Sequence, residues 1–403
     1  MSGTISQGKL RAAALAALVA VVVIIIIIAP GTASAQQREA ARAGMDAERL
    51  RMIPARMKSF VERRTTAGAV MLVARRGRVV SLDAVGFQDL ESKKPMRPDT
   101  IFDTRSVTKV VTAVGIMILM EEGRLALSDP VEKYLPEFKP RGQFKPITIR
   151  QLLTHTAGLP LYRLRESEEI AIKRNRTLTD YVTFLSKQEP EFEPGTQFRY
   201  MSGGFAILGR IIEVVSGKPY EQFMRERVFE PLGMKDSFFF IPPEKRSRIA
   251  AIYRMLDGKL DRWEEIEADN QRAVYPGPEF AMFSTATDLL AFCRMMLDGG
   301  TFKGRRILSK LSVETMTQNQ TLHIKSAVTQ RPVFQGFGWG LWGDPVFDFP
   351  LTSRGSFGHN GAFGAIIWID PEKKLIRIFL QHLLGSGTES NLFMAMAGSA
   401  VID

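Results

Sequence analysis

Ser106 and Lys109 stand three residues apart where a strongly apolar run begins, and such a pair can carry out nucleophilic chemistry. The run covers residues 107–120 and follows a short extended segment at residues 101–103. Residues three apart on a helix share one face, so both side chains are expected on the first turn of a buried helix. A serine hydroxyl needs a base, and a lysine held away from water can lose its charge and serve as that base.

This spacing alone is not diagnostic, because the chain contains it a second time at Ser6 and Lys9. Two later motifs add to it. One is residues 200–202, Tyr-Met-Ser, and the other is residues 359–361, His-Asn-Gly, just before an apolar strand. Only one of the seven tyrosines has Asn or Ser two residues on, and only one of the four histidines has Gly two residues on. The order of the three motifs is therefore more informative than any one of them.

In this order the motifs resemble those of the serine β-lactamase and penicillin-binding family. Within it they resemble the branch similar to class C β-lactamases, which includes esterases, D-stereospecific peptidases and acyltransferases. Residues 104–109 look like the family's nucleophile motif, and residues 200–209 look like its tyrosine motif. Further segments typical of the branch are residues 123–130, 152–160, 231–234 and 284–288. The resemblance covers nearly the whole chain after residue 35.

The resemblance implies a role for each motif residue. Ser106 would be the nucleophile, and Lys109 and Tyr200 would share the proton transfers as a coupled unit. The oxyanion site would consist of two backbone N–H groups, that of Ser106 at the start of its helix and that of Ala362 on the following strand. Gly361 would let that strand pass close to substrate without a side chain in the way.

Two substrate-binding positions depart from the β-lactamase pattern. His359 stands where β-lactamases carry a lysine, and a mostly neutral histidine donates a hydrogen bond but offers little fixed charge. Ser202 stands where asparagine is more usual, so an amide partner for the substrate is lost. Both departures favour ester over lactam hydrolysis. A purely structural His359 is the alternative, and His155 is expected to fix a loop by hydrogen bonding.

An acyl pocket is expected to have apolar walls. Trp342 and Phe363 are candidates for it, and Trp339 is a third. Both tryptophans suit the core of a sheet equally well.

Residues 1–35 have the pattern of a secretory signal peptide. Lys9 and Arg11 precede an unbroken apolar stretch at residues 12–29. A proline-glycine pair interrupts the stretch, and Ala-Ser-Ala at residues 33–35 fits a small-residue cleavage site. We expect cleavage after Ala35 and export to the periplasm or the cell exterior. The alternative is an uncleaved membrane anchor, because the apolar stretch is about long enough to cross a bilayer.

Composition excludes several classes of protein. The single cysteine, Cys293, lies in an apolar helical pattern, so an internal disulfide is excluded and burial is expected. The net charge of +11 is scattered along the chain and no nucleic-acid motif is present. A solvated basic surface is expected, with weak attraction to the cell envelope as the alternative. The four histidines have no metal-ligand spacing and no phosphate-binding glycine loop occurs, which predicts neither metal nor cofactor.

The periodicity predicts an α+β fold over residues 36–403, and the resemblance implies that this range is one hydrolase domain of β-lactamase-like fold. Strand patterns near both ends, at residues 67–85 and 338–380, imply one antiparallel sheet flanked by helices and completed by the C-terminal segment. The α/β lobe would comprise residues 36–124 and 305–403. Residues 125–304 have helical periods without a convincing strand, and would form an inserted, mainly helical lobe.

The sequence as a whole therefore predicts an exported serine hydrolase of β-lactamase-like fold that cleaves small acyl esters through an acyl-enzyme on Ser106. The alternatives are a D-peptidase, penicillin-binding protein or β-lactamase that acts on cell-wall peptides or lactams, and a catalytically silent binding protein of the same fold. The partner would be a small ester or amide substrate. The physiological substrate and the oligomeric state are not predicted.

Overall fold

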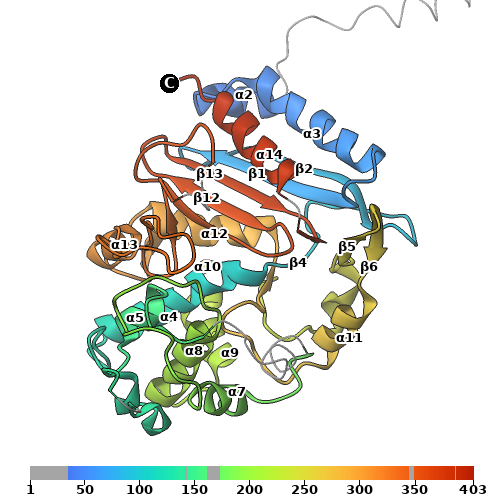
Figure 1. Cartoon of the computed structure of the whole chain (residues 1–403). Helices are drawn as coiled ribbons and strands as arrows, with labels where there is room; N and C mark the ends of the chain where they lie inside the picture. Colours follow the sequence, from blue (N-terminus) through green and yellow to red (C-terminus); the bar gives the residue numbers. More distant parts are fainter. Residues whose placement is uncertain (1–34, 141–142, 161–172, 345–348, 386) are drawn as a thin grey trace, which may run out of the picture.

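A seven-stranded antiparallel sheet forms the centre of the computed structural model, which describes residues 35–140, 143–160, 173–344, 349–385 and 387–403. Its strands lie in the order β10-β11-β12-β13-β1-β2-β3 (Figure 1). Strand β1 pairs with β13, with Val70 opposite Leu380, so the two ends of the chain share one sheet as predicted. The strands are β1 (Gly68–Arg75), β2 (Arg78–Asp89), β3 (Lys94–Pro95), β10 (Gly340–Leu341), β11 (Phe357–Asn360), β12 (Ile366–Asp370) and β13 (Leu375–Leu380).

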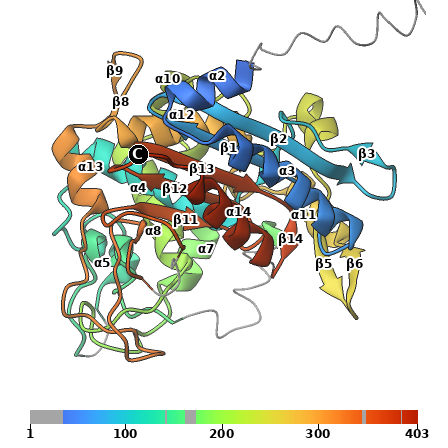
Figure 2. The same ribbon diagram turned by 90° about the horizontal axis from the view of Figure 1, so that it is seen from above.

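Helices cover both faces of this sheet, which explains why β1 is buried along its whole length. Successive strand side chains point to opposite faces. Met71 and Val73 therefore pack under an outer layer formed by α2 (Ala35–Arg42), α3 (Ala47–Glu62) and α14 (Thr388–Ser399) (Figures 1 and 2). Val70 and Leu72 face the other way, into the main core. We call this second side the inner face.

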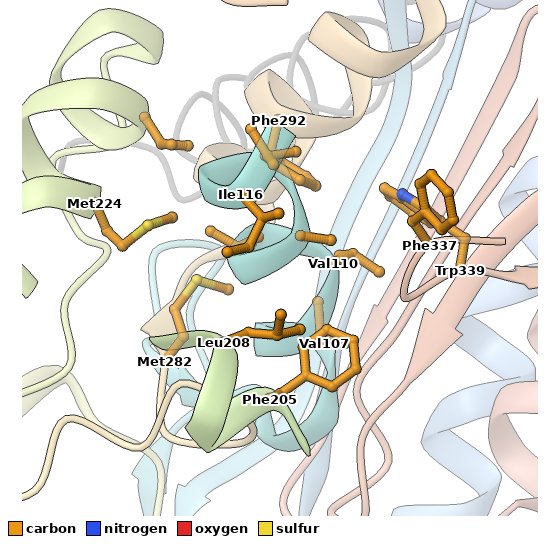
Figure 3. Close-up of a cluster of buried hydrophobic side chains, with 14 of the residues drawn as sticks. Val107, Val110, Ile116, Phe205, Leu208, Met224, Met282, Phe292, Phe337 and Trp339 are labelled. Carbon is orange, nitrogen blue, oxygen red and sulfur yellow. The ribbon is translucent and has the colours of Figure 1, made fainter. Parts of the chain in front are cut away.

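Helix α4 (Thr108–Glu121) runs through the main core below the inner face (Figure 3). Every residue from Thr108 to Leu119 is buried, as expected for a helix that is apolar on all sides. Its neighbours are α8 (Gly203–Ser216) and α9 (Tyr220–Met224), while α12 (Ala286–Leu297) packs against β1, β12 and β13. The core thus fixes the start of α4, where the predicted nucleophile lies.

The remaining α-helices and strands of the described residues are short. They are α5 (Ile149–Leu153), α7 (Leu178–Leu185), α10 (Glu230–Leu232), α11 (Glu264–Arg272), α13 (Lys310–Thr317), β4 (Phe102–Asp103), β5 (Tyr253–Leu256), β6 (Lys259–Arg262), β7 (Phe283–Ser284), β8 (Thr301–Phe302), β9 (Arg305–Arg306) and β14 (Leu383–Leu384). The lobe boundaries given above stay a prediction.

The structure corrects two expectations from the sequence pattern and decides a third point that the sequence left open. Strands β5 and β6 pair with each other inside the range expected to be mainly helical, and β5 also pairs with β14 from the C-terminal segment. Charged residues hide the alternation of these two strands in the sequence. The strand expected over residues 363–369 begins only at Ile366. Trp339 is not a pocket wall: it is fully buried in the main core, where its ring stacks on Phe292 (Figure 3).

The signal peptide predicted at residues 1–35 lies almost wholly outside the described residues, which begin with α2. None of the helices in the described ranges is both long enough and apolar enough to cross a membrane. Cys293 is buried in α12, as its apolar surroundings predicted.

Candidate active site

The Ser106 hydroxyl lies within hydrogen-bonding distance of the Lys109 amine. Lys109 is fully buried, and its Nζ donates to Ser106 Oγ at 3.1 Å and to the backbone carbonyl of Glu279 at 2.7 Å. Ser106 itself sits in a 3₁₀ turn (Arg105–Val107) that leads directly into α4, so it precedes the α-helix by two residues. The two hydrogen bonds fix the amine beside a half-exposed hydroxyl, which is the geometry that a base and its nucleophile require.

Tyr200 lies against the same amine. The Nζ atom of Lys109 is 5.0 Å from the centroid of the Tyr200 ring, and 6.0 Å from that of Phe205 on α8. Tyr200 comes from the loop before α8, about ninety residues after the nucleophile in the chain. The structure thus brings together Ser106, Lys109 and Tyr200 from two separate segments.

His155 supports the segment that carries Tyr200. Its Nδ1 accepts a hydrogen bond from the Met201 backbone N–H at 3.1 Å, and its ring lies 4.5 Å from the Tyr200 ring. Its carbonyl accepts from the Arg199 N–H at 3.0 Å. The expected loop-fixing role is therefore confirmed. Burial, together with the nearby charge of Lys109, holds the pKa of His155 well below its ordinary value, so the imidazole is neutral.

His359 lies at the end of β11, buried, with its ring 6.2 Å from that of Tyr200. Burial and the charge of Lys109 lower its pKa to about 3. Nδ1 is 2.7 Å from the Asn360 carbonyl, which can only accept, so Nδ1 carries the proton and Nε2 is an acceptor. The ring is therefore neutral, as expected.

Gly361 and Ala362 lie in the turn between β11 and β12, so Ala362 is not on a strand as expected. A Cβ atom at Gly361 would lie 2.2 Å from the Thr104 carbonyl oxygen. The glycine therefore permits close approach to the backbone just before the nucleophile. Ala362 is exposed, and its N–H has no acceptor within the described part of the protein, so it is available to a ligand.

Ser202 is half-buried and directly precedes α8. Its hydroxyl does not cap the helix, although serine often does so at this position. Of the candidate pocket residues, Trp342 is 39% exposed, and the central guanidinium carbon of Arg354 lies 5.4 Å from its ring centroid. Phe363 is buried beneath the guanidinium of Arg105.

A buried polar group that the sequence did not reveal lies behind Lys109. Both carboxylate oxygens of Glu279 accept from the Tyr275 hydroxyl at 2.6 Å. Burial raises the pKa of Glu279 to about 7, against the lowering effects of Tyr275 and Lys109. The guanidinium of Arg174 donates two hydrogen bonds to the Tyr275 backbone carbonyl. No sequence motif connects these residues with α4, so only the fold identifies them.

Among the described residues no cluster of side chains could hold a metal ion.

Comparison with known proteins identifies the family of the chain. The model of the family described as Beta-lactamase matches residues 53–397. An uncharacterized protein of Mycobacterium tuberculosis is 32% identical over 355 residues, which are 78% of this chain and 86% of that protein. Esterase EstB of Burkholderia gladioli is 36% identical over 195 residues, 45% of this chain and 50% of the esterase.

Solved structures give the same result for the fold. EstCE1, a hydrolase with promiscuous acyltransferase activity, is 26% identical, with a TM-score of 0.76 over 89% of this chain and 98% of that one. The octameric penicillin-binding protein homologue from Pyrococcus abyssi is 27% identical, with a TM-score of 0.71 over 89% and 77% of the two chains. The chain belongs to the Beta-lactamase family and is a serine hydrolase of that family.

Proposed function

We propose that the protein is a carboxylesterase that cleaves small acyl esters through a covalent acyl-enzyme on Ser106. The observation that carries the proposal is the buried amine of Lys109, held 3.1 Å from the Ser106 hydroxyl by its second hydrogen bond to the Glu279 carbonyl. Similarity to an esterase and to a hydrolase with acyltransferase activity supports the choice of ester chemistry.

In the proposed reaction, Ser106 Oγ attacks the ester carbonyl carbon while its proton passes to Lys109. The carbonyl oxygen becomes an oxyanion that the N–H groups of Ser106 and Ala362 would stabilise. Collapse breaks the bond to the alkoxide, which leaves with the proton returned through Lys109 and Tyr200. Water then attacks the acyl-enzyme, and the same two side chains take its proton and return one to Ser106.

The neutral state of His359 favours esters over lactams and peptides. A lactam or peptide needs its leaving nitrogen protonated, whereas an alkoxide or phenolate leaves with less help. The imidazole at this position is neutral, because burial and the charge of Lys109 lower its pKa to about 3. It therefore provides no second cation beside Tyr200 to assist proton delivery.

A substrate panel tests the proposal. We expect ready hydrolysis of p-nitrophenyl acetate and butyrate, and a kcat/KM for nitrocefin lower by about two decades or more. Ser106→Ala should lose roughly three or more decades in rate and keep its thermal unfolding temperature. A higher kcat/KM for nitrocefin would replace the esterase by a β-lactamase. A Ser106→Ala variant with substantial activity would remove the nucleophile assignment.

The second candidate is a D-peptidase or penicillin-binding protein, which the likeness to the Pyrococcus abyssi homologue favours. D-alanyl peptides in the same panel distinguish it from an esterase. A fluorophosphonate reacts with an activated serine in either enzyme, and absence of labelling at Ser106 would indicate the catalytically silent binding protein instead.

We also propose that the protein is exported, on the basis of Lys9, Arg11 and the apolar stretch that follows them. N-terminal sequencing of protein isolated from the cell envelope or medium should begin at Gln36. A full-length product confined to the cytoplasm would contradict export, and a full-length product in the membrane fraction would indicate the uncleaved anchor.

A further inference from the structure

Arg105, the residue immediately before the proposed nucleophile, has an unusual conformation and set of contacts. Its φ is +47°, a left-handed value that costs a non-glycine residue roughly 1–3 kcal/mol and persists only where surrounding contacts enforce it. Its backbone N–H donates to the Asp103 carboxylate at 3.0 Å, and its guanidinium lies 3.4 Å from the other carboxylate oxygen. The strained turn is therefore held from within the same short segment.

The guanidinium also contacts two aromatic rings that come from different parts of the chain. Its central carbon lies 4.7 Å from the ring centroid of Phe280 and 4.4 Å from that of Phe363. A planar guanidinium presents broad faces to aromatic rings, which the compact ammonium of lysine cannot do. One side chain thus connects the loop at residue 280, the turn at residue 363 and the nucleophile turn.

Each ring is adjacent in sequence to a group that the proposed reaction uses. Phe280 follows Glu279, whose carbonyl holds the Lys109 amine at 2.7 Å. Phe363 follows Ala362, whose N–H is the second proposed oxyanion donor. The backbone at Gly361 lies so close to Arg105 that a Cβ atom added to the glycine would be 3.1 Å from the Arg105 Cβ atom. Arg105 therefore contacts the immediate neighbours of the base anchor and of the oxyanion turn.

We propose that Arg105 is a positioning residue that sets the Lys109 anchor and the oxyanion turn relative to Ser106. This inference depends on the proposed acyl-transfer function. Misplacement of catalytic groups by about 1 Å costs up to roughly two decades in rate. The expected defect is therefore in kcat, with little change in KM, because the positioned groups act on the reacting atoms.

The variants must not leave the Asp103 carboxylate charged and unpaired, because it is fully buried and an unpaired buried charge is strongly destabilising. Arg105→Lys keeps the charge and loses the planar group. The double variant Asp103→Asn with Arg105→Met removes both charges and keeps a long apolar side chain. Arg227→Met is a matched control, since Arg227 also pairs with a carboxylate, Glu122, and lies 5.6 Å from a phenylalanine ring, but at the opposite end of α4.

For Arg105→Lys and for the double variant we expect kcat for p-nitrophenyl butyrate to fall by about ten-fold or more, with KM within about three-fold of wild type. Labelling of Ser106 by a fluorophosphonate should slow to a similar extent, because the tetrahedral adduct needs the oxyanion site. Arg227→Met should leave all three quantities unchanged.

Arg105→Lys with kcat and labelling rate within about two-fold of wild type would overturn the positioning role, even if the wild type is a proven esterase. If Arg105→Lys fails to fold, the same two-fold limit on kcat and labelling rate is applied to the double variant Asp103→Asn with Arg105→Met. A wild-type protein that neither hydrolyses esters nor labels at Ser106 would instead remove the proposed function, and this inference with it.

Discussion

Both faces of the sheet pack against a buried apolar cluster, yet they use buried charge differently. On the outer side, the guanidinium of Arg75 donates to the carbonyls of Ala43, Gly44 and Lys373 and pairs with Asp403. It ties the segment between α2 and α3 and the residue Asp403 to the end of β1. On the inner side, the only hydrogen bonds of the Lys109 amine within the described structure are to one carbonyl and to a half-exposed hydroxyl.

The comparison separates stability from chemistry. A buried cation whose donors are saturated by carbonyls stabilises the fold and offers nothing to a ligand. A buried amine that shares a hydrogen bond with a reactive hydroxyl can take up its proton when the amine is neutral. Substitutions in the outer layer should therefore lower the free energy of unfolding without lowering kcat. Substitutions on the inner face should lower both quantities.

The largest effect is expected where Lys109 and Tyr200 are removed together. Lys109→Ala and Tyr200→Phe should each lower kcat/KM by roughly two decades or more, and the double variant should be scarcely worse than the worse single. The reason is that both side chains serve the same proton transfers around one nitrogen. Steady-state kinetics on a p-nitrophenyl ester measures this, and losses that add in free energy would show separate roles.

A matched pair of truncations sharpens the contrast between the faces. Phe379 lies under the outer layer against Phe393, and Phe205 lies on the inner side near Lys109 and His155. Both are fully buried, so Phe→Ala at either position should cost about 3–5 kcal/mol in the free energy of unfolding. Only Phe205→Ala should also lower kcat, by about ten-fold, when both are assayed well below their unfolding temperatures. A comparable kcat loss in Phe379→Ala would break the comparison.

The smallest effect is a pH dependence of stability that belongs to the inner face. The pKa of His359 is lowered by burial to about 3 in the folded protein, whereas an unfolded histidine titrates near 6.5. Below about pH 6.5, His359 therefore binds a proton in the unfolded chain but stays unprotonated in the folded protein. The stabilising contribution of neutral His359 is fully present above that pH and is lost as the pH falls toward 3.

Urea unfolding of wild type and His359→Gln at a series of pH values measures how much His359 contributes to the free energy of unfolding at each pH. The wild type should lose stability relative to the variant as the pH falls from about 6.5. The comparison with a variant is needed because Glu279 acts in the opposite direction: its pKa is raised to about 7 by burial, so its contribution fades as the pH rises. A constant difference between the two proteins would contradict a neutral buried His359.

The sequence by itself determined the elements with strong periodicity and the three motifs. The continuous apolar run before Met120 predicted a buried helix, and α4 is buried on all sides. Alternation near both ends predicted a sheet shared by the two ends of the chain, which β1 and β13 form. Ser106 and Lys109 could be paired from their spacing because residues three apart meet within one turn whatever the rest of the fold does.

Only the tertiary structure decided which distant groups meet at that turn. The Glu279 carbonyl that holds Lys109 is 170 residues away, and no local pattern marks a backbone carbonyl for such a role. The tautomer of His359 depends on a neighbouring carbonyl and on burial, neither of which its residue type specifies. Trp339 and Trp342 have similar local sequences, yet one is core and the other is surface, because burial depends on what packs from other segments.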